Sequence, residues 1–150
     1  MNEGETVEAS HILELSGWRR SFYPWEFLDA VGRRDFPRAV QRGMAIVERG
    51  MDLTMLISSL TGLFQELFFR HVSRRSGEKG EGKTIPPRPA ARLSPQIRRK
   101  LPKYQELYGL KDVSHVLRFL ARADRQLKST GTQGRSIFIP LIHRITHEHA

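Results

Sequence analysis

The chain contains no cysteine, and this excludes a disulfide framework and any thiolate-bound metal. The absence fits a reducing compartment, and we expect a cytoplasmic protein. No apolar run reaches the roughly 18 residues that a membrane-spanning helix needs. The N-terminus is acidic and polar and lacks the basic and apolar regions of a secretory signal. We therefore expect no membrane partner.

Two structural signals are also missing. No segment alternates convincingly between apolar and polar residues, and no internal repeat is present. The chain does have enough apolar sequence, 39% of its 150 residues, for the core of one domain. We predict an all-α fold, a bundle of about six to seven helices. Residues 1–20 are expected to be a lead-in with a short helix from Thr6 to about Leu15, and residues 21–150 the helical domain.

The strongest helical signal follows Asp52, which is a good N-cap. Over residues 52–75, apolar residues recur at the three- and four-residue spacing of one helix face. A long amphipathic helix is stabilised mainly by what packs on its apolar stripe, so we expect this one at the centre of the core. The stripe consists of Leu53, Leu56, Ile57, Leu60, Leu63, Phe64, Leu67 and Phe68.

Capping and helix-breaking residues predict the ends of the helices before it. Pro24 suits the start of a helix, and Gly32 suits its end. Asp35 is a good N-cap for the next helix, with Pro37 in the tolerated first turn. Gly50 is expected to end that helix.

Prolines govern the expected boundaries of the later helices. Residues 94–95, Ser-Pro, predict a helix start, and Pro102 predicts an interruption or a kink in that helix. The next helix is expected to begin at Asp112 or Ser114. Pro140 is acceptable only near a helix start, so the last helix is expected to begin close to Phe138.

Positive charge is concentrated in residues 70–103, which hold eleven Lys or Arg and two Glu. This net charge of +9 equals the formal charge of the whole chain, so the remainder is neutral overall. Within the segment, residues 76–93 are rich in Gly, Pro and basic residues, and we predict a flexible basic loop there. The segment would attract polyanions. A solvated loop without a specific partner fits the same composition.

Basic side chains continue on a predicted short helix after that loop. Residues at this spacing can follow a nucleic-acid phosphate backbone, and a solvated helix face is the alternative. Tyr104 and Tyr108 share a face of the same helix, where they could stack on a partner, although packing on the core is the preferred interpretation. The basic residues are Arg98, Arg99, Lys100 and Lys103.

Residues 77–84, GEKGEGKT, satisfy the nucleotide-binding pattern G-x-x-x-x-G-K-[ST]. A phosphate-binding loop of that kind needs a buried strand before it and a helix directly after it. Here a long amphipathic helix precedes the pattern, and the sequence IPPRP that follows it cannot be helical. We interpret the match as accidental and predict no nucleotide cofactor and no small-molecule substrate.

The histidines do not predict a metal site. His143 and His147 share a helix face, as zinc ligands can, but no third ligand is held rigidly near them. No Ser or Thr lies in a nucleophile elbow, and the carboxylates are mostly paired with neighbouring Arg along helices. We expect no catalytic residue, no metal and no enzyme activity in this chain.

Two stretches resemble parts of a known family. Residues 25–35, WEFLDAVGRRD, are similar to the pattern F-x-L-x-D-A-[IV]-x-x-[RK]-D, and residues 120–128, LARADRQLK, contain D-x-x-L-K. In the DNA polymerase III delta subunit of the bacterial clamp loader, the first pattern opens the helical C-terminal collar domain. The second pattern closes its penultimate helix. The resemblance covers roughly residues 20–147, which is nearly the whole chain.

The resemblance implies a non-catalytic oligomerisation domain that packs against the collar domains of other clamp-loader subunits in DNA replication. It also implies proximity to primer–template DNA, which a basic helix could face. In the family, ATPase-like and clamp-opening domains precede the collar, so a chain confined to the collar would be a fragment of its parent. The charge alone suggests an alternative, a stand-alone helical nucleic-acid-binding module using residues 70–103.

The second stretch is where we expect contact between subunits. Asp124 falls in line with the apolar stripe of its helix, where a carboxylate must be paired or hydrogen-bonded. An intrachain pair, with Lys128 or with an Arg on a neighbouring helix, is one interpretation, and a contact with another subunit is the other. The expected interface residues are Arg122, Asp124, Arg125 and Lys128.

Overall fold

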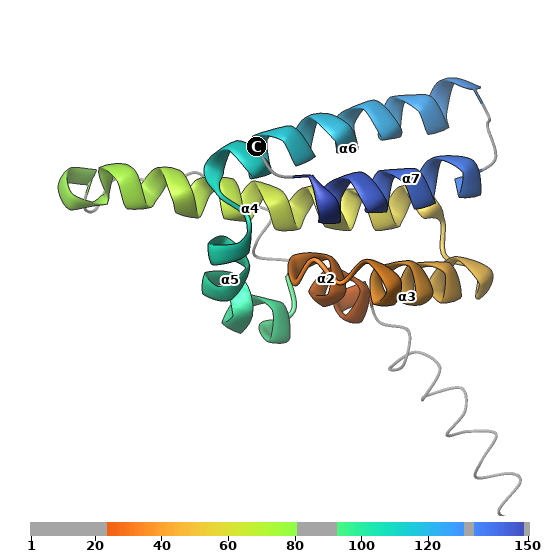
Figure 1. Ribbon diagram of the computed structural model, residues 1–150, viewed down its shortest axis with the longest axis horizontal. Coiled ribbons are helices and arrows are strands. Elements are labelled where there is room, and N and C mark those ends of the chain that lie inside the picture. The colour runs from red at the N-terminus through yellow and green to blue at the C-terminus, as the bar shows by residue number, and fades with distance from the viewer. Residues whose placement is uncertain (1–23, 81–92, 131–133, 149–150) are drawn as a thin grey trace, which may run out of the picture.

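The computed structural model describes residues 24–80, 93–130 and 134–148, and these residues form six α-helices and no strand (Figure 1). The predicted all-α class and the approximate number of helices are confirmed. The short helix expected from Thr6 lies outside the described residues. The helices are α2 (Pro24–Gly32), α3 (Phe36–Glu48), α4 (Leu53–Gly80), α5 (Pro95–Leu107), α6 (Leu110–Thr130) and α7 (Gly134–His147).

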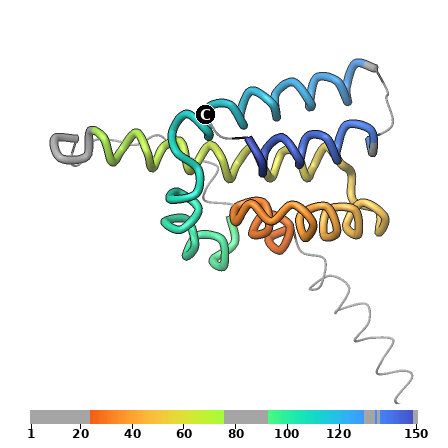
Figure 2. The backbone as a smooth tube through the Cα atoms, in the orientation of Figure 1, coloured from red at the N-terminus to blue at the C-terminus, as the bar shows by residue number. Residues whose placement is uncertain are grey.

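Helix α4 is the longest, and the other helices are arranged around it (Figure 1). Helix α6 packs along α4, and α7 contacts both α6 and α3. The short helix α2 packs against α3 and also touches α4, α5 and α7. Helix α5 runs across the direction of α4, as the tube in Figure 2 shows. The C-terminal part of α4 extends past the rest of the bundle.

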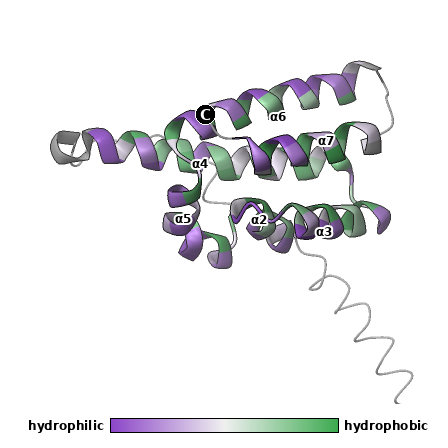
Figure 3. Cartoon of the chain, in the orientation of Figure 1, coloured by the Kyte–Doolittle hydropathy of each residue, from purple (hydrophilic) through white to green (hydrophobic). Residues whose placement is uncertain are grey.

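The apolar stripe of α4 forms the centre of the core, as predicted. Leu56, Leu60, Leu63 and Leu67 are all fully buried. Burying an aliphatic or aromatic side chain contributes roughly 1.5–3 kcal/mol, so this stripe is the largest single source of stability. Figure 3 shows hydrophobic residues on α4 where it lies within the bundle and hydrophilic ones on its projecting end. Within the described residues, no helix is both long and apolar enough to cross a membrane.

Three predicted N-caps are confirmed by their hydrogen bonds. The Asp35 carboxylate accepts a bond from the backbone N–H of residue 38, at 3.2 Å, and Pro37 occupies the first turn of α3. Asp52 accepts from the N–H of residue 54 at 3.2 Å, and Ser94 accepts from the N–H of residue 97 at 3.3 Å. Gly50 follows α3 with φ +111°, a conformation that favours glycine. Sequence-local chemistry therefore accounts for these ends.

The end of α4 and the start of α6 differ from the expectation. Helix α4 continues to Gly80, so the first five residues of the predicted 76–93 loop are helical, and residues 81–92 lie outside the described residues. Helix α6 begins at Leu110, two residues before Asp112. The carboxylate of Asp112 reaches back to the N–H of Gly109, at 3.1 Å, which is how a residue at the third position of a helix caps its start.

The two internal prolines do not end their helices. Helix α5 continues through Pro102, and α7 begins at Gly134, well before Pro140. The predictions of an interruption at Pro102 and of a late start for α7 were therefore wrong. Each proline is exposed, and the residue four positions before it is exposed too. Each proline therefore lies on the solvent-exposed side of its helix.

Candidate functional site

Asp29, from the stretch that resembles the start of a collar domain, is a buried carboxylate at the junction of α2 and α5. It is 8% exposed. Its Oδ1 accepts a hydrogen bond from the Tyr104 hydroxyl at 2.5 Å. Arg33 Nε lies 3.3 Å from Oδ2, and Lys100 Nζ lies 3.5 Å from Oδ1. The charge of Asp29 is therefore satisfied within the domain.

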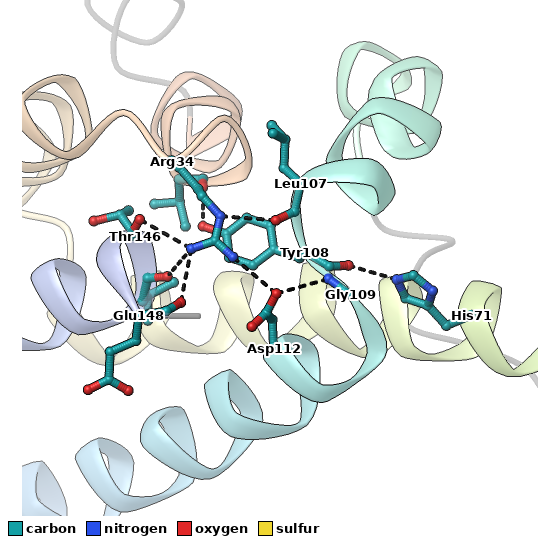
Figure 4. A network of polar contacts seen from close by, with 10 residues as sticks. Arg34, His71, Leu107, Tyr108, Gly109, Asp112, Thr146 and Glu148 are labelled. Carbon is teal, nitrogen blue, oxygen red and sulfur yellow. Dashed lines mark hydrogen bonds and ion pairs between the residues drawn. The ribbon is translucent and has the colours of Figure 1, made fainter. Parts of the chain in front are cut away.

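Arg34, from the same stretch, lies in the turn between α2 and α3 and forms hydrogen bonds with the C-terminal ends of α5 and α7 (Figure 4). Its Nε donates to the carbonyl of Leu107, the last residue of α5, at 3.0 Å. Its Nη1 donates to the carbonyls of Thr146 and Glu148, at 3.2 and 3.1 Å, and more weakly to that of Ile145 at 3.5 Å. The last carbonyls of a helix lack partners within it, and Arg34 supplies them for α7.

The other side of the Arg34 guanidinium meets α6 and an aromatic ring. Its Nη2 lies 3.3 Å from Oδ2 of Asp112, the oxygen that also caps α6 through Gly109. Its Cζ lies 4.0 Å from the centre of the Tyr108 ring, a cation–π distance. The adjacent carbonyl of Tyr108 is hydrogen-bonded to Nε2 of His71 on α4, at 2.7 Å. Arg34 thus joins four separate parts of the chain, and its φ of +63° shows that its backbone is held in a left-handed conformation.

Both tyrosines of α5 belong to the core, which confirms the preferred interpretation and rules out stacking on a partner. Tyr104 and Tyr108 are fully buried. The Tyr108 hydroxyl donates to the carbonyl of Val31 at 2.6 Å, and its ring packs edge-on against Phe64. Burial raises the pKa of both phenols well above the ordinary value, and the hydrogen bond to Asp29 raises the pKa of Tyr104 further.

The basic residues predicted on α5 do not form one uniform surface. Arg98, Arg99 and Lys103 are exposed. Lys100 is only half-exposed and forms the ion pair with Asp29 described above. It therefore contributes to the junction between α2 and α5, and only the other three present their charges outward.

The basic end of α4 lies next to α5. Arg70 Nε donates to Oε1 of Gln105 on α5, at 3.1 Å. One helical turn further along α4, Arg74 and Arg75 are exposed. These contacts bring part of the basic segment 70–103 together, with α4 on one side and α5 on the other.

The four interface residues predicted on α6 occupy different environments. Asp124 forms an ion pair with Lys128 at 3.1 Å, which confirms the intrachain pairing. The carboxylate is half-exposed, and Ala123 takes the buried position beside it, so the expectation that Asp124 lies on the core stripe was wrong. Arg122 and Arg125 are both exposed, and of the four only Arg122 lines a groove.

That groove, called here the α6–α7 groove, has a volume of about 470 Å³. Each helix contributes residues at the spacing of a single helix face. Phe119 forms part of its floor, and the guanidinium of Arg144 lies 4.9 Å from the Phe119 ring. Sequence reasoning identified Arg122 alone, because the sequence does not show that α6 and α7 lie side by side. The lining residues are Phe119, Arg122, Ala123, Gln126, Ser136, Ile137, Pro140, Leu141 and Arg144.

A larger groove, of about 830 Å³, lies between α2 and α4 and is called the α2–α4 groove. Its lining contains no charged residue: Trp25 and Met55 supply apolar surface, and Ser58 and Ser59 supply hydroxyls. Met55 is 57% exposed, more than any other large hydrophobic residue in the described part of the chain. Described residues join undescribed ones at the rim of this groove, at Pro24 and Leu93.

The histidines of α7 pack on each other and on α3. The rings of His143 and His147 stack at 4.2 Å, and both meet the edge of Phe36. Nδ1 of His147 lies 3.1 Å from the carbonyl of His143. In the part of the chain that the structure covers, no three potential metal ligands come together.

The nucleotide-binding pattern over residues 77–84 is divided between a helix and residues that are not described. Gly77 to Gly80 are the last four residues of α4. Residues 81–84 lie outside the described residues.

Compared with known proteins, the chain matches no family model, and no curated protein or solved structure matches it significantly.

Proposed function

We propose that this chain is a non-catalytic oligomerisation domain of the collar type found in the clamp-loader delta subunit. In this proposal it packs against the collar domains of other loader subunits during DNA replication. The catalytic and clamp-opening functions of such an assembly would reside in other domains or subunits.

The observation that carries the proposal is that two charged residues of the stretch 25–35, Asp29 and Arg34, bind groups on other helices of the same chain. Asp29 and Arg34 occupy the positions of the acidic and the basic residue in the collar pattern. Both form their contacts within the chain, Asp29 at the α2–α5 junction and Arg34 at the ends of α5 and α7. The pattern therefore specifies how helices are joined, which is what a shared architecture requires, and it does not form a reactive pocket.

The later stretch supports the second half of the proposal because it lies on the outside. Arg122 is exposed on α6 and lines the α6–α7 groove beside its apolar floor, whereas Arg125 and Lys128 extend the exposed basic face of α6 beyond the lining. Contacts between proteins commonly combine an apolar centre with a polar rim. This surface has both parts, and we place the subunit contact there.

A second candidate function is a nucleic-acid-binding module. The observation that favours it is the clustering of exposed basic residues on two touching helices, Arg74 and Arg75 on α4 and Arg98, Arg99 and Lys103 on α5. Such residues neutralise phosphates and release counterions, so the affinity falls steeply with salt. A collar contact with an apolar centre is far less sensitive.

The two functions are separated by mixing the chain with the other clamp-loader subunits of its own organism. Size-exclusion chromatography is run at about 50 and 200 mM salt, and a fluorescent primer–template duplex is titrated under the same conditions. We expect a complex with a loader subunit at both salt concentrations. A nucleic-acid binder with six to ten phosphate contacts would instead lose roughly 10³–10⁵ in duplex affinity over that range. No subunit complex at either concentration would contradict the proposal.

A further inference from the structure

The α6–α7 groove combines an apolar floor with basic walls. Phe119 and Ile137 are half-buried within it, and Pro140 is exposed at its opening. Arg122 stands on the α6 side and Arg144 on the α7 side. We propose that this groove receives an amphipathic helix of another clamp-loader subunit whose apolar ridge is flanked by Asp or Glu. The inference rests on the proposed function and adds the location of the contact and the chemistry of the partner.

The shape of the groove suits a helix. On α6 the lining residues lie at positions 119, 122, 123 and 126, and on α7 at positions 137, 140, 141 and 144. Both sets have the spacing of one helix face, so the groove runs along two neighbouring helices of the bundle. Grooves of this kind bind a helix through side chains spaced three and four residues apart. A short loop or an extended strand would not match this arrangement as well.

The charge around the groove identifies the partner as acidic. Helices α6 and α7 together contain seven Lys or Arg and two Asp. Asp112 is bound by Arg34 and Asp124 by Lys128, and Glu148, directly after α7, pairs with Arg144 at 3.6 Å. The lining itself contains Arg122 and Arg144 and no carboxylate, and among the described residues no acidic side chain pairs with Arg122. Opposite charges on the partner would steer its approach and set its register, whereas like charges would be rejected.

The α2–α4 groove is larger, but it is a weaker candidate for this partner. Its lining is uncharged, so it does not select a partner by charge. The α6–α7 groove has a charge signature that specifies its occupant.

The first test compares two identical changes of charge on one helix. Arg122→Glu alters the wall of the groove, and Arg125→Glu makes the same change three residues further along, outside the lining. Both arginines are exposed, so both variants should fold. We expect Arg122→Glu to weaken binding to the loader subunit by about tenfold or more and Arg125→Glu by less than about threefold, because only the first places like charge in the contact. The dissociation constants are measured by isothermal titration calorimetry, with thermal melts as the check of folding.

The second test reverses the sign of a charge at one position. Pro140→Glu and Pro140→Lys both remove the same apolar surface from the opening of the groove. An acidic partner should bind the Lys variant at least about fivefold more tightly than the Glu variant, because the Glu variant repels it. Since both variants replace a proline inside α7 with a residue that has an N–H, neither should weaken the helix.

The outcomes distinguish the inference from the proposed function. Selective loss in Arg122→Glu, with Lys preferred over Glu at position 140, supports the inference. If the unmodified chain binds a loader subunit and all four variants bind equally well, the inference falls and the proposed function stands. A preference for Glu over Lys at position 140 overturns the acidic partner. If the unmodified chain binds no loader subunit, both fall together.

Discussion

The two stretches that resemble the collar family use their charged residues in opposite ways. In the first stretch, Asp29 is buried and Arg34 is partly buried, and each binds at least three groups of the same chain. In the second stretch, Asp124 makes one exposed pair with Lys128, and Arg122 and Arg125 face outward. A short pattern can thus carry architectural information at one place and surface information at another, and only the three-dimensional environment of each residue distinguishes them.

Removing the Arg34 side chain should give the largest difference in stability between the two stretches. We expect Arg34→Ala to lower the free energy of unfolding by about 3–5 kcal/mol, because it leaves Asp112 and the carbonyl of Leu107 without their partner. The adjacent Arg33→Ala removes a single pair whose arginine is 54% exposed, so it should cost less than about 1 kcal/mol. Urea denaturation followed by circular dichroism measures both. Similar losses for the two variants would show that Arg34 has no special role.

A glycine at the same position separates the side chain from the backbone. Arg34 has φ +63°, which glycine adopts without strain and alanine does not. Arg34→Gly should therefore be about 1 kcal/mol less damaging than Arg34→Ala, although both lose every contact of the guanidinium. If the order were reversed, the left-handed backbone at this turn would not be a source of strain.

The next comparison sets the two aspartates against each other. Asp29→Ala should cost about 2–4 kcal/mol, because it leaves the buried hydroxyl of Tyr104 without its acceptor and Lys100 without its pair. Asp124→Ala removes only the exposed pair with Lys128 and should cost less than about 0.5 kcal/mol. Thermal and urea unfolding of both variants provides the measurement. A larger loss at Asp124 would mean that the later stretch is architectural as well.

The last comparison concerns alkaline pH and the two buried tyrosines. The folded pKa values of Tyr104 and Tyr108 lie above those of unfolded tyrosine, so their contribution is complete below about pH 10 and is lost as the pH rises further. Each buried phenol should then steepen the fall in unfolding free energy by up to about 1.4 kcal/mol per pH unit. Unfolding at pH 9 to 11 should show a shallower fall in Tyr108→Phe than in the unmodified chain. An unchanged slope would place the Tyr108 hydroxyl outside the titrating core.

Much of the fold follows from local chemistry that the sequence displays. The spacing of Leu56, Leu60 and Leu63 predicts the buried face of α4, and Asp35 and Ser94 predict the starts of their helices. These features depend on residues within one or two helical turns of each other. The residues that determine these features are therefore close together in the sequence.

The helix boundaries at the prolines could not be predicted in the same way. Whether Pro102 or Pro140 ends a helix depends on which side of its helix the proline ring occupies. That orientation is set by how α5 and α7 pack on the bundle. The same applies to the α6–α7 groove: the sequence does not show that α6 and α7 lie side by side, so Ile137, Pro140 and Arg144 were not recognised as part of a surface with Arg122.

The Arg34 junction was also beyond local reasoning. The arginine contacts backbone carbonyls 73 to 114 residues away, and backbone groups carry no sequence signal of their own. A resemblance can mark Arg34 as a recurring position without revealing what it binds. Predicting such a junction requires knowing which helix ends meet in space.

The reach of Arg34 also determines when the domain can be completed during translation. Its last acceptor, the carbonyl of Glu148, is separated from it by 114 positions. Residues 34 to 148 must therefore all have left the ribosome before this hydrogen bond can form. Until then the guanidinium of Arg34 remains hydrated while the earlier helices assemble. A message truncated before α7 would yield a protein in which Arg34 lacks its acceptors at residues 145, 146 and 148. Such an incompletely folded protein would be exposed to quality-control proteases.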